Sequence, residues 1–161
     1  MKLFSKDKKE PNNKFYTVCG LVEIDQKVLL VRHTYGTAKG RLLLPGGYVK
    51  ESELPTKAVE REIFEETGIK AKVKSLLAMQ FKSNQWCAVF LLDYIEGTPK
   101  SDGHENSEVL LITPSEAIKR DDITNMSRKI LTAYLKNRSE LAKSDYIANS
   151  CSEDDYVIFG V

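Results

Sequence analysis

One stretch near the middle of the chain predicts a helix that carries more carboxylates than a helix tolerates without a positive partner. The range 55–67 shows helical spacing of apolar residues, namely Ala58, Val59 and Ile63. A proline suits its first turn, and Gly68 suits the position just past its end. On this helix Glu62 lies three residues before Glu65 and four before Glu66, so the carboxylates share a surface and repel one another. The segment therefore needs a cation close by.

The charge around this helix differs from that of the whole chain. The window 47–69 has six glutamates (Glu51, Glu53, Glu60, Glu62, Glu65 and Glu66) against Lys50, Lys57 and Arg61, which gives about −3, whereas the 161 residues sum to +1. Hard divalent cations prefer carboxylate and carbonyl oxygens. The turn Pro45-Gly46-Gly47 lets backbone carbonyls approach an ion, because glycine has no side chain in the way. The window predicts an Mg²⁺ or Mn²⁺ site.

The rest of the chain predicts a sheet around this helix. Strand patterns occupy 14–24, 27–32, 41–44, 71–79, 86–95 and 109–113, with a tight turn at Asp25-Gln26. Polar loops are expected at 33–40 and 97–107, short helical turns at 114–119, a second full helix at 125–137 and a terminal strand at 156–159. Helices between and after strands indicate an α/β or α+β sandwich.

Length and composition limit the function classes. A chain of 161 residues fits one domain, and we expect a lead-in at 1–13, a domain at 14–140 and an extension of unknown role at 141–161. A charge of +1 argues against a nucleic-acid polymer as partner. No apolar run reaches about 20 residues, which argues against a membrane span. The absence of a signal-peptide pattern and three scattered cysteines (Cys19, Cys87 and Cys151) predict a cytoplasmic protein without disulfides.

The window 47–69 resembles the Nudix box, Gly-x5-Glu-x7-Arg-Glu-aliphatic-x-Glu-Glu-x-Gly-aliphatic. All nine defined positions are filled, by Gly47, Glu53, Arg61, Glu62, Ile63, Glu65, Glu66, Gly68 and Ile69. A looser resemblance extends over about 16–134. The resemblance implies an α/β/α sandwich with a mixed sheet, in which the box forms a loop and a helix. It also implies hydrolysis of a nucleoside diphosphate linked to another moiety, with cleavage inside the pyrophosphate.

The resemblance assigns roles to the residues of the box. Glu65 and Glu66 are the principal expected metal ligands, helped by Glu62 and the carbonyl of Gly46. Glu53 holds the junction of loop and helix or contacts the metal, and Arg61 orients the glutamates by ion pairing. Similar proteins differ in the general base, so it is either Glu62 or a carboxylate of the later loop, Glu105 or Glu108.

The general chemistry of pyrophosphate hydrolysis supports the same reaction. A pyrophosphate repels hydroxide, whereas divalent ions neutralise its oxygens and lower the pKa of a bound water, from which a glutamate then removes a proton. Arg32, Arg41 and the Tyr35 hydroxyl are candidates for holding phosphates, and Trp86 is a candidate for stacking on a base.

The substrate and the cap of the helix are open at this point. No subfamily signature is present outside the box, so a nucleoside triphosphate and an ADP-ribose or nucleotide-sugar substrate stand equal. A non-catalytic nucleotide sensor is the alternative, and an isoprenoid diphosphate isomerase is disfavoured because the chain has only two histidines. Leu54 replaces the Ser or Thr that often caps the box helix, so Ser52 is a candidate cap if the helix starts earlier. The extension after residue 140 either packs on the domain or pairs with a second subunit in a homodimer.

Overall fold

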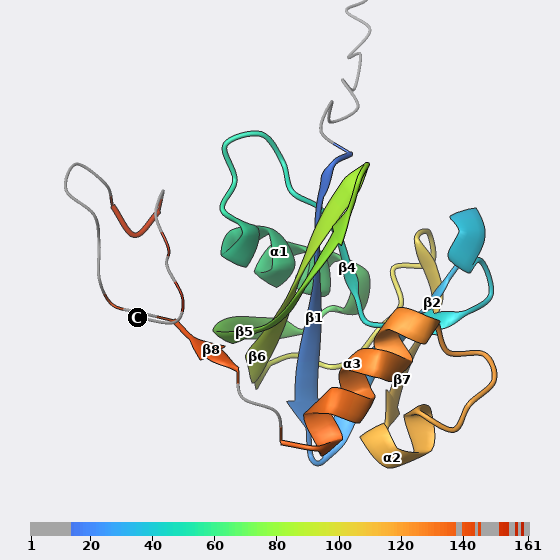
Figure 1. Cartoon of the computed structure of the whole chain (residues 1–161). Helices are drawn as coiled ribbons and strands as arrows, with labels where there is room; N and C mark the ends of the chain where they lie inside the picture. Colours follow the sequence, from blue (N-terminus) through green and yellow to red (C-terminus); the bar gives the residue numbers. More distant parts are fainter. Residues whose placement is uncertain are drawn as a thin grey trace, which may run out of the picture.

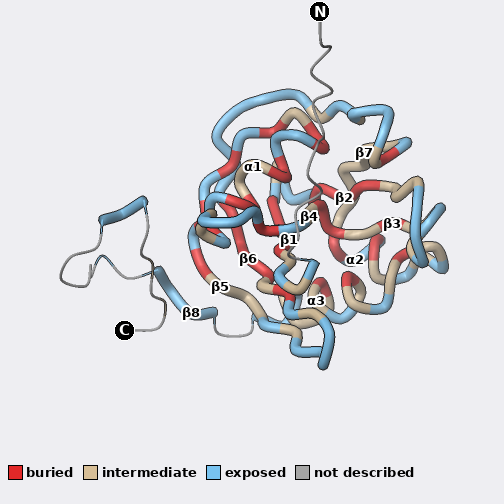
Figure 2. Tube along the Cα trace, turned by 90° about the horizontal axis from the view of Figure 1, so that it is seen from above, coloured by how far each residue is buried: buried red, intermediate tan, exposed pale blue. Residues whose placement is uncertain are grey.

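The computed structural model describes residues 14–137, 140–143, 145, 152–154, 157 and 159. In this part of the chain a mixed sheet lies between one helix on one face and two on the other (Figure 1). The buried residues concentrate along the strands inside the fold (Figure 2). The α/β/α sandwich with a mixed sheet is therefore confirmed.

Eight strands of the described residues form the sheet. They are β1 (Tyr16–Ile24), β2 (Lys27–His33), β3 (Leu42–Leu43), β4 (Gly46–Tyr48), β5 (Lys70–Lys82), β6 (Gln85–Glu96), β7 (Asn106–Ile112) and β8 (Leu141–Ala142). The order is β3-β2-β1-β6-β5-β8, while β4 pairs with β1 and β7 pairs with β2. The pair β1–β6 is parallel and the other pairs are antiparallel. Along one edge of β1, β2 pairs with its C-terminal end and β4 pairs with its N-terminal end. The sheet therefore divides between β2 and β4 on that edge.

The helices are α1 (Pro55–Thr67), α2 (Pro114–Ala117) and α3 (Asn125–Leu135), with a 3-10 turn η1 (Gly36–Ala38) in the loop after β2. Helix α1 has the predicted bounds, with Pro55 in its first turn and Gly68 just past its end at φ +73°. The alternative cap by Ser52 is wrong. The N-cap is Leu54, which has no capping side-chain bond, and Ser52 lies in the loop at φ +60°.

Two apolar layers hold the helices to the sheet. On one face Ala58, Val59 and Ile63 of α1 pack with alternate strand residues such as Val18, Val22, Leu29 and Phe90. On the other face Leu131 of α3 and Ala117 of α2 pack with the intervening residues such as Leu21, Val28, Leu30 and Val89. We call these the α1 face and the α3 face. Because successive strand residues point to opposite faces, each polar side chain of a strand can be assigned to the α1 face or to the α3 face.

The structure differs from the sequence predictions in its short strands. The sequence predicts a turn at Pro45-Gly46-Gly47, yet Gly46–Tyr48 form β4 against Thr17–Cys19 of β1. Leu141–Ala142 pair with Ser75–Leu76 of β5, so the start of the extension adds to the sheet. The expected terminal strand lies largely outside the described residues, although Phe159 forms one bridge with Lys143. Among the residues described, none of the helices combines the length and apolar character that crossing a membrane requires.

Candidate functional site

The carboxylate of Glu66 is buried between helix α1 and strand β4. Glu66 is only 2% exposed to solvent, and its Oε2 accepts a hydrogen bond of 2.9 Å from the backbone N–H of Gly46. Burial raises the pKa of Glu66 to about 8, opposed by that hydrogen bond and assisted by the charges of Glu62, Glu105 and Asp102. A carboxylate buried among other carboxylates is where a cation would be most strongly attracted.

Gly46 and Gly47, where the chain enters strand β4 after Pro45, pack directly on β1 and on the box glutamates. We call these two residues the glycine turn. A Cβ atom at Gly47 would lie 2.5 Å from the carboxyl carbon of Glu62, and one at Gly46 would lie 2.0 Å from the carbonyl oxygen of Val18. Neither position has room for a side chain. Strand β4 can therefore lie between β1 and the glutamates only because both residues are glycine.

Arg61 binds the remaining glutamates of the box. Its Nε and Nη2 donate to the two oxygens of Glu53 at 2.8 and 2.9 Å. Its Nη1 donates to Glu62 at 2.7 Å and to Glu65 at 3.0 Å, and its Nη2 also reaches the carbonyl oxygen of Tyr48 at 3.1 Å. These bonds raise the pKa of Arg61, first through Glu53 and, against the opposing effect of burial, through Glu62. One guanidinium thus joins the loop before α1 to the buried Glu62 and the exposed Glu65.

Glu53 lies at the junction of loop and helix. Besides its two bonds to Arg61, its Oε2 accepts a hydrogen bond from the backbone N–H of Lys50 at 3.0 Å. Although burial opposes it, Arg61 and this N–H lower the pKa of Glu53. Both carboxylate oxygens of Glu53 are therefore engaged in holding the loop. Glu53 is linked to the buried Glu62 through Arg61, which binds both.

The loop before β7 brings a further glutamate to this cluster. Its turn is built on Asp102, whose Oδ1 accepts hydrogen bonds from the backbone N–H groups of His104, Glu105 and Asn106 at 2.9 to 3.1 Å. Despite burial, these donors lower the pKa of Asp102. The charge of Glu105 raises the pKa of both Glu62 and Glu66. Glu105 therefore belongs to the electrostatic environment of the box.

The donor chemistry of the cluster suits a hard divalent cation. Among the described residues, no three His, Cys, Asp or Glu side chains converge closely enough to complete an ion site by themselves. A Mg²⁺ ion does not require that, because it is bound by one or two carboxylates, several waters and substrate phosphates. Glu66 is buried without a cationic partner in the part of the chain that the structure describes, and the pKa of Glu62 is also raised, chiefly by burial. Both features fit an ion that neutralises these oxygens.

A cavity of about 250 Å³ opens beside the glycine turn. Its lining includes Gly46, Gly47, Tyr35, His33 and Tyr48 at the box, and it continues along the α3 face past Cys19, Cys87, Met126 and Ile130. Burial raises the pKa of the Tyr35 hydroxyl to about 12, and the charges of Glu105 and Glu66 add to the shift. Tyr35 thus lines the cavity and feels the charge of the carboxylates. Cys19 and Cys87 are free thiols, while Cys151 lies outside the described residues.

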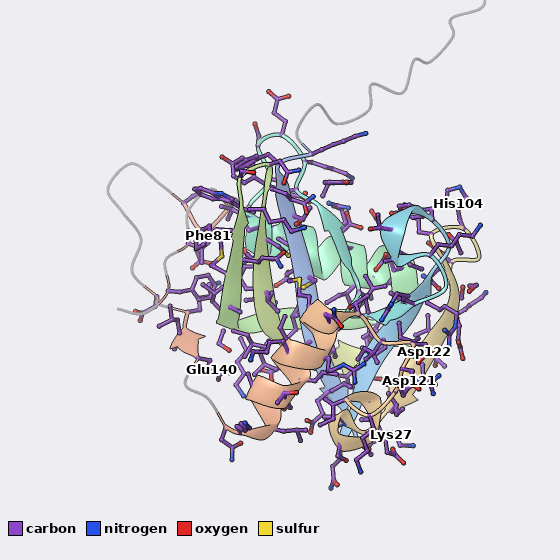
Figure 3. The ribbon with its side chains drawn as sticks, turned by 45° about the vertical axis from the view of Figure 1, so that its right-hand side comes forward. Lys27, Phe81, His104, Asp121, Asp122 and Glu140 are labelled. Atoms are coloured by element: carbon purple, nitrogen blue, oxygen red, sulfur yellow. The ribbon has the colours of Figure 1, made fainter. Side chains whose placement is uncertain are left out.

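Arg32 and Glu108 lie on the other side of the sheet. They are cross-strand partners on β2 and β7, and they share the α3 face with Leu30 and Leu110. Arg32 binds Glu108 at 2.7 Å, Asp122 at 3.0 Å and the carbonyl oxygen of Gly40 at 2.8 Å. Figure 3 labels Asp122 on the loop between α2 and α3. The guanidinium of Arg32 thus joins strand and loop, with Glu108 as one partner. The roles that the sequence predicts for these two residues, in phosphate binding and in catalysis, stay predictions.

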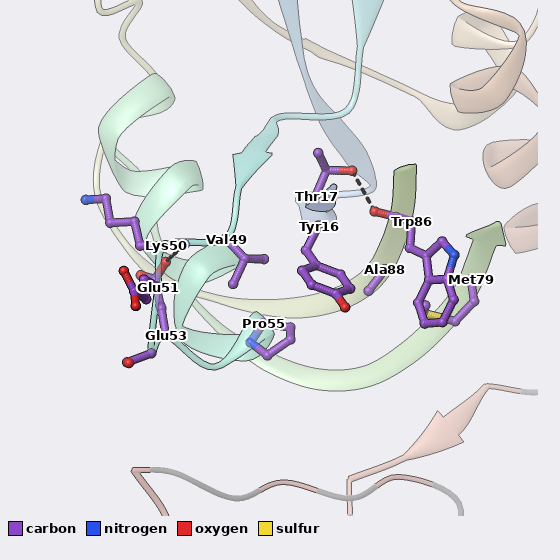
Figure 4. Close-up of a pocket in the computed structure, with 11 residues that line it drawn as sticks. Tyr16, Thr17, Val49, Lys50, Glu51, Glu53, Pro55, Met79, Trp86 and Ala88 are labelled. Carbon is purple, nitrogen blue, oxygen red and sulfur yellow. Dashed lines mark hydrogen bonds between the residues drawn. The ribbon is translucent and has the colours of Figure 1, made fainter. Parts of the chain in front are cut away.

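Arg41 and Trp86 have partners in other parts of the fold. Arg41 donates from Nη2 to the carbonyl oxygen of Ile123 at 2.7 Å and holds the same loop as Arg32. Trp86 packs edge-on against Phe81 at 5.1 Å and lines a second cavity, of about 460 Å³, on the α1 face (Figure 4). That cavity is also lined by Val49, Glu53 and Pro55. The substrate contacts that the sequence predicts for Arg41 and Trp86 stay predictions.

The sequence reasoning did not select His33 and Asn106, which lie beside the cluster. Asn106 is fully buried, and its side-chain N–H group donates to the backbone oxygen of Glu66 at 2.8 Å. The ring of His33 stacks on Tyr35, with 4.3 Å between ring centroids. Neither residue belongs to a motif, so position in the fold is what identifies them.

Comparisons with known proteins agree with this geometry. A model of the NUDIX domain matches residues 14–134. An ADP-ribose pyrophosphatase of Methanocaldococcus jannaschii is 41% identical over 90 residues, which cover 52% of this chain and 53% of that protein. An 8-oxo-dGDP phosphatase of Danio rerio is 31% identical over 86 residues, which cover 53% of this chain and 26% of that protein. The matched part is thus about half or less of these curated relatives.

Solved structures share the fold. A NUDIX hydrolase from Nitrosomonas europaea superposes with a TM-score of 0.69 at 25% identity, covering 76% of this chain and 70% of that one. A MutT NUDIX hydrolase from Burkholderia pseudomallei superposes with a TM-score of 0.66 at 22% identity, covering 73% and 95%. With the family model spanning most of the chain and the box glutamates gathered against the glycine turn, the chain belongs to the Nudix family.

Proposed function

We propose that this protein is a metal-dependent hydrolase that cleaves the pyrophosphate linkage of a nucleoside diphosphate joined to another moiety. The observation that carries the proposal is the buried Glu66. It lies against Gly46 and Gly47 of β4, with Glu62 and Glu105 nearby and no cationic partner among the residues that the structure describes. The 41% identity to a protein named ADP-ribose pyrophosphatase makes ADP-ribose and related nucleotide sugars the first substrates to test. Nucleoside triphosphates are the second group.

Glu66, Glu65 and Glu62 would hold Mg²⁺ or Mn²⁺, with the carbonyl of Gly46 beside them. Bound there, the ion neutralises pyrophosphate oxygens and makes a water acidic. The chain itself supplies the remaining functions. Arg61 keeps Glu62 and Glu65 in place by direct ion pairs. Glu62 and Glu105 are the candidate bases, because a base must lie within hydrogen-bond reach of the water whose proton it takes.

The cavity beside the turn supports the binding of a nucleotide. Its volume of about 250 Å³ and its mostly apolar lining suit a nucleoside. The Tyr35 hydroxyl lies at the junction of the cavity and the carboxylates and can donate a hydrogen bond to a phosphate oxygen. The substrate would lie across Gly46 and Gly47, with its nucleoside in the cavity and its pyrophosphate at the glutamates. A cytoplasmic location and a homodimer stay predictions of the sequence.

A substrate panel tests the proposal. It comprises ADP-ribose, nucleotide sugars, NADH, diadenosine polyphosphates and nucleoside triphosphates, each with Mg²⁺ and with Mn²⁺. We expect metal-dependent release of two phosphate-containing products from at least one nucleoside diphosphate compound, and none in EDTA. The Glu66→Gln variant is the matched inactive control. A flat panel with a folded, metal-binding protein would contradict hydrolysis and favour a sensor.

A further inference from the structure

The last residue of β2, His33, and the first residue of β7, Asn106, are partners across the ladder. The neighbouring pair is Arg32 with Glu108, so Ser107 is an extra residue on β7 and the register shifts there. Such a bulge turns the following side chain toward the other face of the sheet. Arg32 and Glu108 therefore lie on the α3 face, whereas Asn106 reaches helix α1.

Asn106 has one side-chain atom engaged and one free of any partner. Its Nδ2 donates to the backbone oxygen of Glu66, and this fixes the orientation of the amide, because only the nitrogen can donate to a carbonyl. The other atom, Oδ1, is buried and has no hydrogen-bond partner among the described residues. The atom of the amide that lacks a partner is thus an acceptor. A buried acceptor without a donor costs free energy.

His33 has a matching atom. Its Nδ1 is also buried without a partner among the described residues. The backbone on both sides is held, since the N–H of His33 donates to Arg41 at 3.0 Å and its carbonyl oxygen accepts from Gly40 at 2.8 Å. His33 also lines the cavity beside the glycine turn. Because Nδ1 is buried, Nε2 is the ring nitrogen left for a ligand in that cavity.

We infer that His33 and Asn106 form a positioning and specificity pair, in which Oδ1 of Asn106 accepts the proton of Nδ1, directly or through one water, and Nε2 of His33 accepts a hydrogen bond from a ribose hydroxyl of the substrate. A neutral imidazole with its proton on Nδ1 has only a lone pair on Nε2. It therefore binds a hydroxyl, which donates, and not an ionised phosphate oxygen, which cannot. Burial, which lowers the pKa of His33 against the opposing charge of Glu105, favours the neutral ring.

The pair also ties the cavity to the box. From the substrate hydroxyl the contacts run through His33 and Asn106 to the backbone of Glu66, a proposed metal ligand. Thr34 strengthens this connection, since its N–H and its Oγ1 both bind the carbonyl oxygen of Glu105 at 3.1 and 2.9 Å. The inference rests on the proposed function for the identity of the substrate, but the state of the His33 ring is independent of it.

The tautomer of His33 provides the first test. The chain has two histidines, and His104, exposed on the loop before β7, serves as an internal reference (Figure 3). Long-range ¹H–¹⁵N NMR at pH 8 of the full-length protein without nucleotide should show His33 with its proton on Nδ1. In Asn106→Leu that proton should move to Nε2 while His104 is unchanged. A wild-type His33 with its proton on Nε2 overturns the pair, and this reading does not depend on whether the leucine variant folds.

Kinetics with matched substrates provide the second test. An asparagine side chain places its amide near the position of Nδ1, and a glutamine places its amide near that of Nε2. With ADP-ribose we expect His33→Asn to lower kcat/KM about tenfold, mainly through KM, and His33→Gln to recover most of the loss. With the analogue that lacks the contacted ribose hydroxyl, found by removing each hydroxyl in turn, wild type and His33→Asn should be equal.

Asp122→Asn is the control for general loosening, because Asp122 lies on the α3 face and touches no part of the pair. Its kcat/KM should be the same as wild type for every analogue. An equal loss by His33→Asn on all analogues overturns the hydroxyl contact. If the wild-type protein hydrolyses nothing in the panel, the proposed function fails, and the NMR result still decides the pair.

Discussion

The two faces of the sheet each carry a cluster of acidic side chains, and the clusters differ in their positive partners. On the α3 face Glu108 and Asp122 are bound by two arginines, Arg32 and Arg120, at 2.7 to 3.0 Å. On the α1 face four glutamates (Glu62, Glu65, Glu66 and Glu105) gather with one arginine among the described residues, Arg61, which forms ion pairs with Glu62, Glu65 and Glu53.

This difference separates a structural cluster from a candidate site. The cluster on the α3 face joins β2, β7 and the loop before α3. It is balanced, because each of its two carboxylates is paired with an arginine. The unbalanced cluster retains a buried carboxylate whose pKa is raised, which destabilises the metal-free fold. The cost in stability at Glu66 is offset when a cation binds to the cluster. The following predictions test whether the two clusters behave so differently.

The largest effect is expected from Glu66→Gln. The amide can keep the hydrogen bond from Gly46 but cannot hold Mg²⁺, so turnover should fall at least about 100-fold. In EDTA at pH 8 the same variant should be more stable than wild type, because it removes a buried charge. Phosphate release and thermal unfolding measure the two effects. Wild-type turnover in this variant would show that the cluster is not the reaction centre.

Metal addition should stabilise one cluster only. At a Mg²⁺ concentration 100 times Kd, the wild-type protein should gain about 2.7 kcal/mol in its free energy of unfolding. Glu66→Gln should show little of this gain, whereas Asp122→Asn should show all of it. Urea unfolding with and without Mg²⁺ provides the measurement. An equal gain in wild type and Glu66→Gln would place the ion elsewhere.

A comparison of Glu105→Gln with Glu108→Gln separates two glutamates that are three residues apart. Glu105→Gln should lower kcat about tenfold or more, since the residue lies in the environment of Glu62 and Glu66. Glu108→Gln should leave kcat within about twofold and cost about 1 kcal/mol of stability, because it weakens an exposed ion pair with Arg32. Comparable losses of kcat in both variants would contradict the assignment of faces.

The smallest effect concerns acid stability. Arg120 and Arg32 lower the pKa of Asp122 in the folded protein. A carboxylate with a lowered pKa stabilises the fold above its unfolded pKa of about 3.9, and this contribution is lost as pH falls through the folded value. The stability difference between wild type and Asp122→Asn should therefore be about 1 kcal/mol at pH 7 and shrink below pH 4. A difference that stays constant down to pH 2 would refute the ion-pair origin.

The sequence predicts the box well because the box is local. The bounds of α1 follow from the spacing of Ala58, Val59 and Ile63, with Pro55 and Gly68 at its ends. The short strand β4 is missed because two of its three residues are glycines, which show no alternation. Its pairing with β1 is visible only in the fold.

Assignments outside the box depend on pairing and could not be made from spacing. Counting by twos along β7 gives Asn106 and Glu108 the same face, yet the extra residue Ser107 separates them. Arg32 is chosen over His33 when charge is the criterion, although the arginine is already bound to Glu108 and Asp122. A long-range register is what distinguishes these residues, and a single sequence does not contain it.

The pairing of β7 with β2 has a consequence for the order of folding. Arg32 and Glu108 are 76 residues apart, whereas the box is continuous in the chain. During synthesis the glutamate helix can therefore form long before the strand that completes its surroundings has left the ribosome. Contacts of such sequence separation slow folding, because the loop must close before they give any stability. The carboxylates of the box are thus synthesised before β7, but their surroundings are complete only when Asn106 reaches the backbone of Glu66.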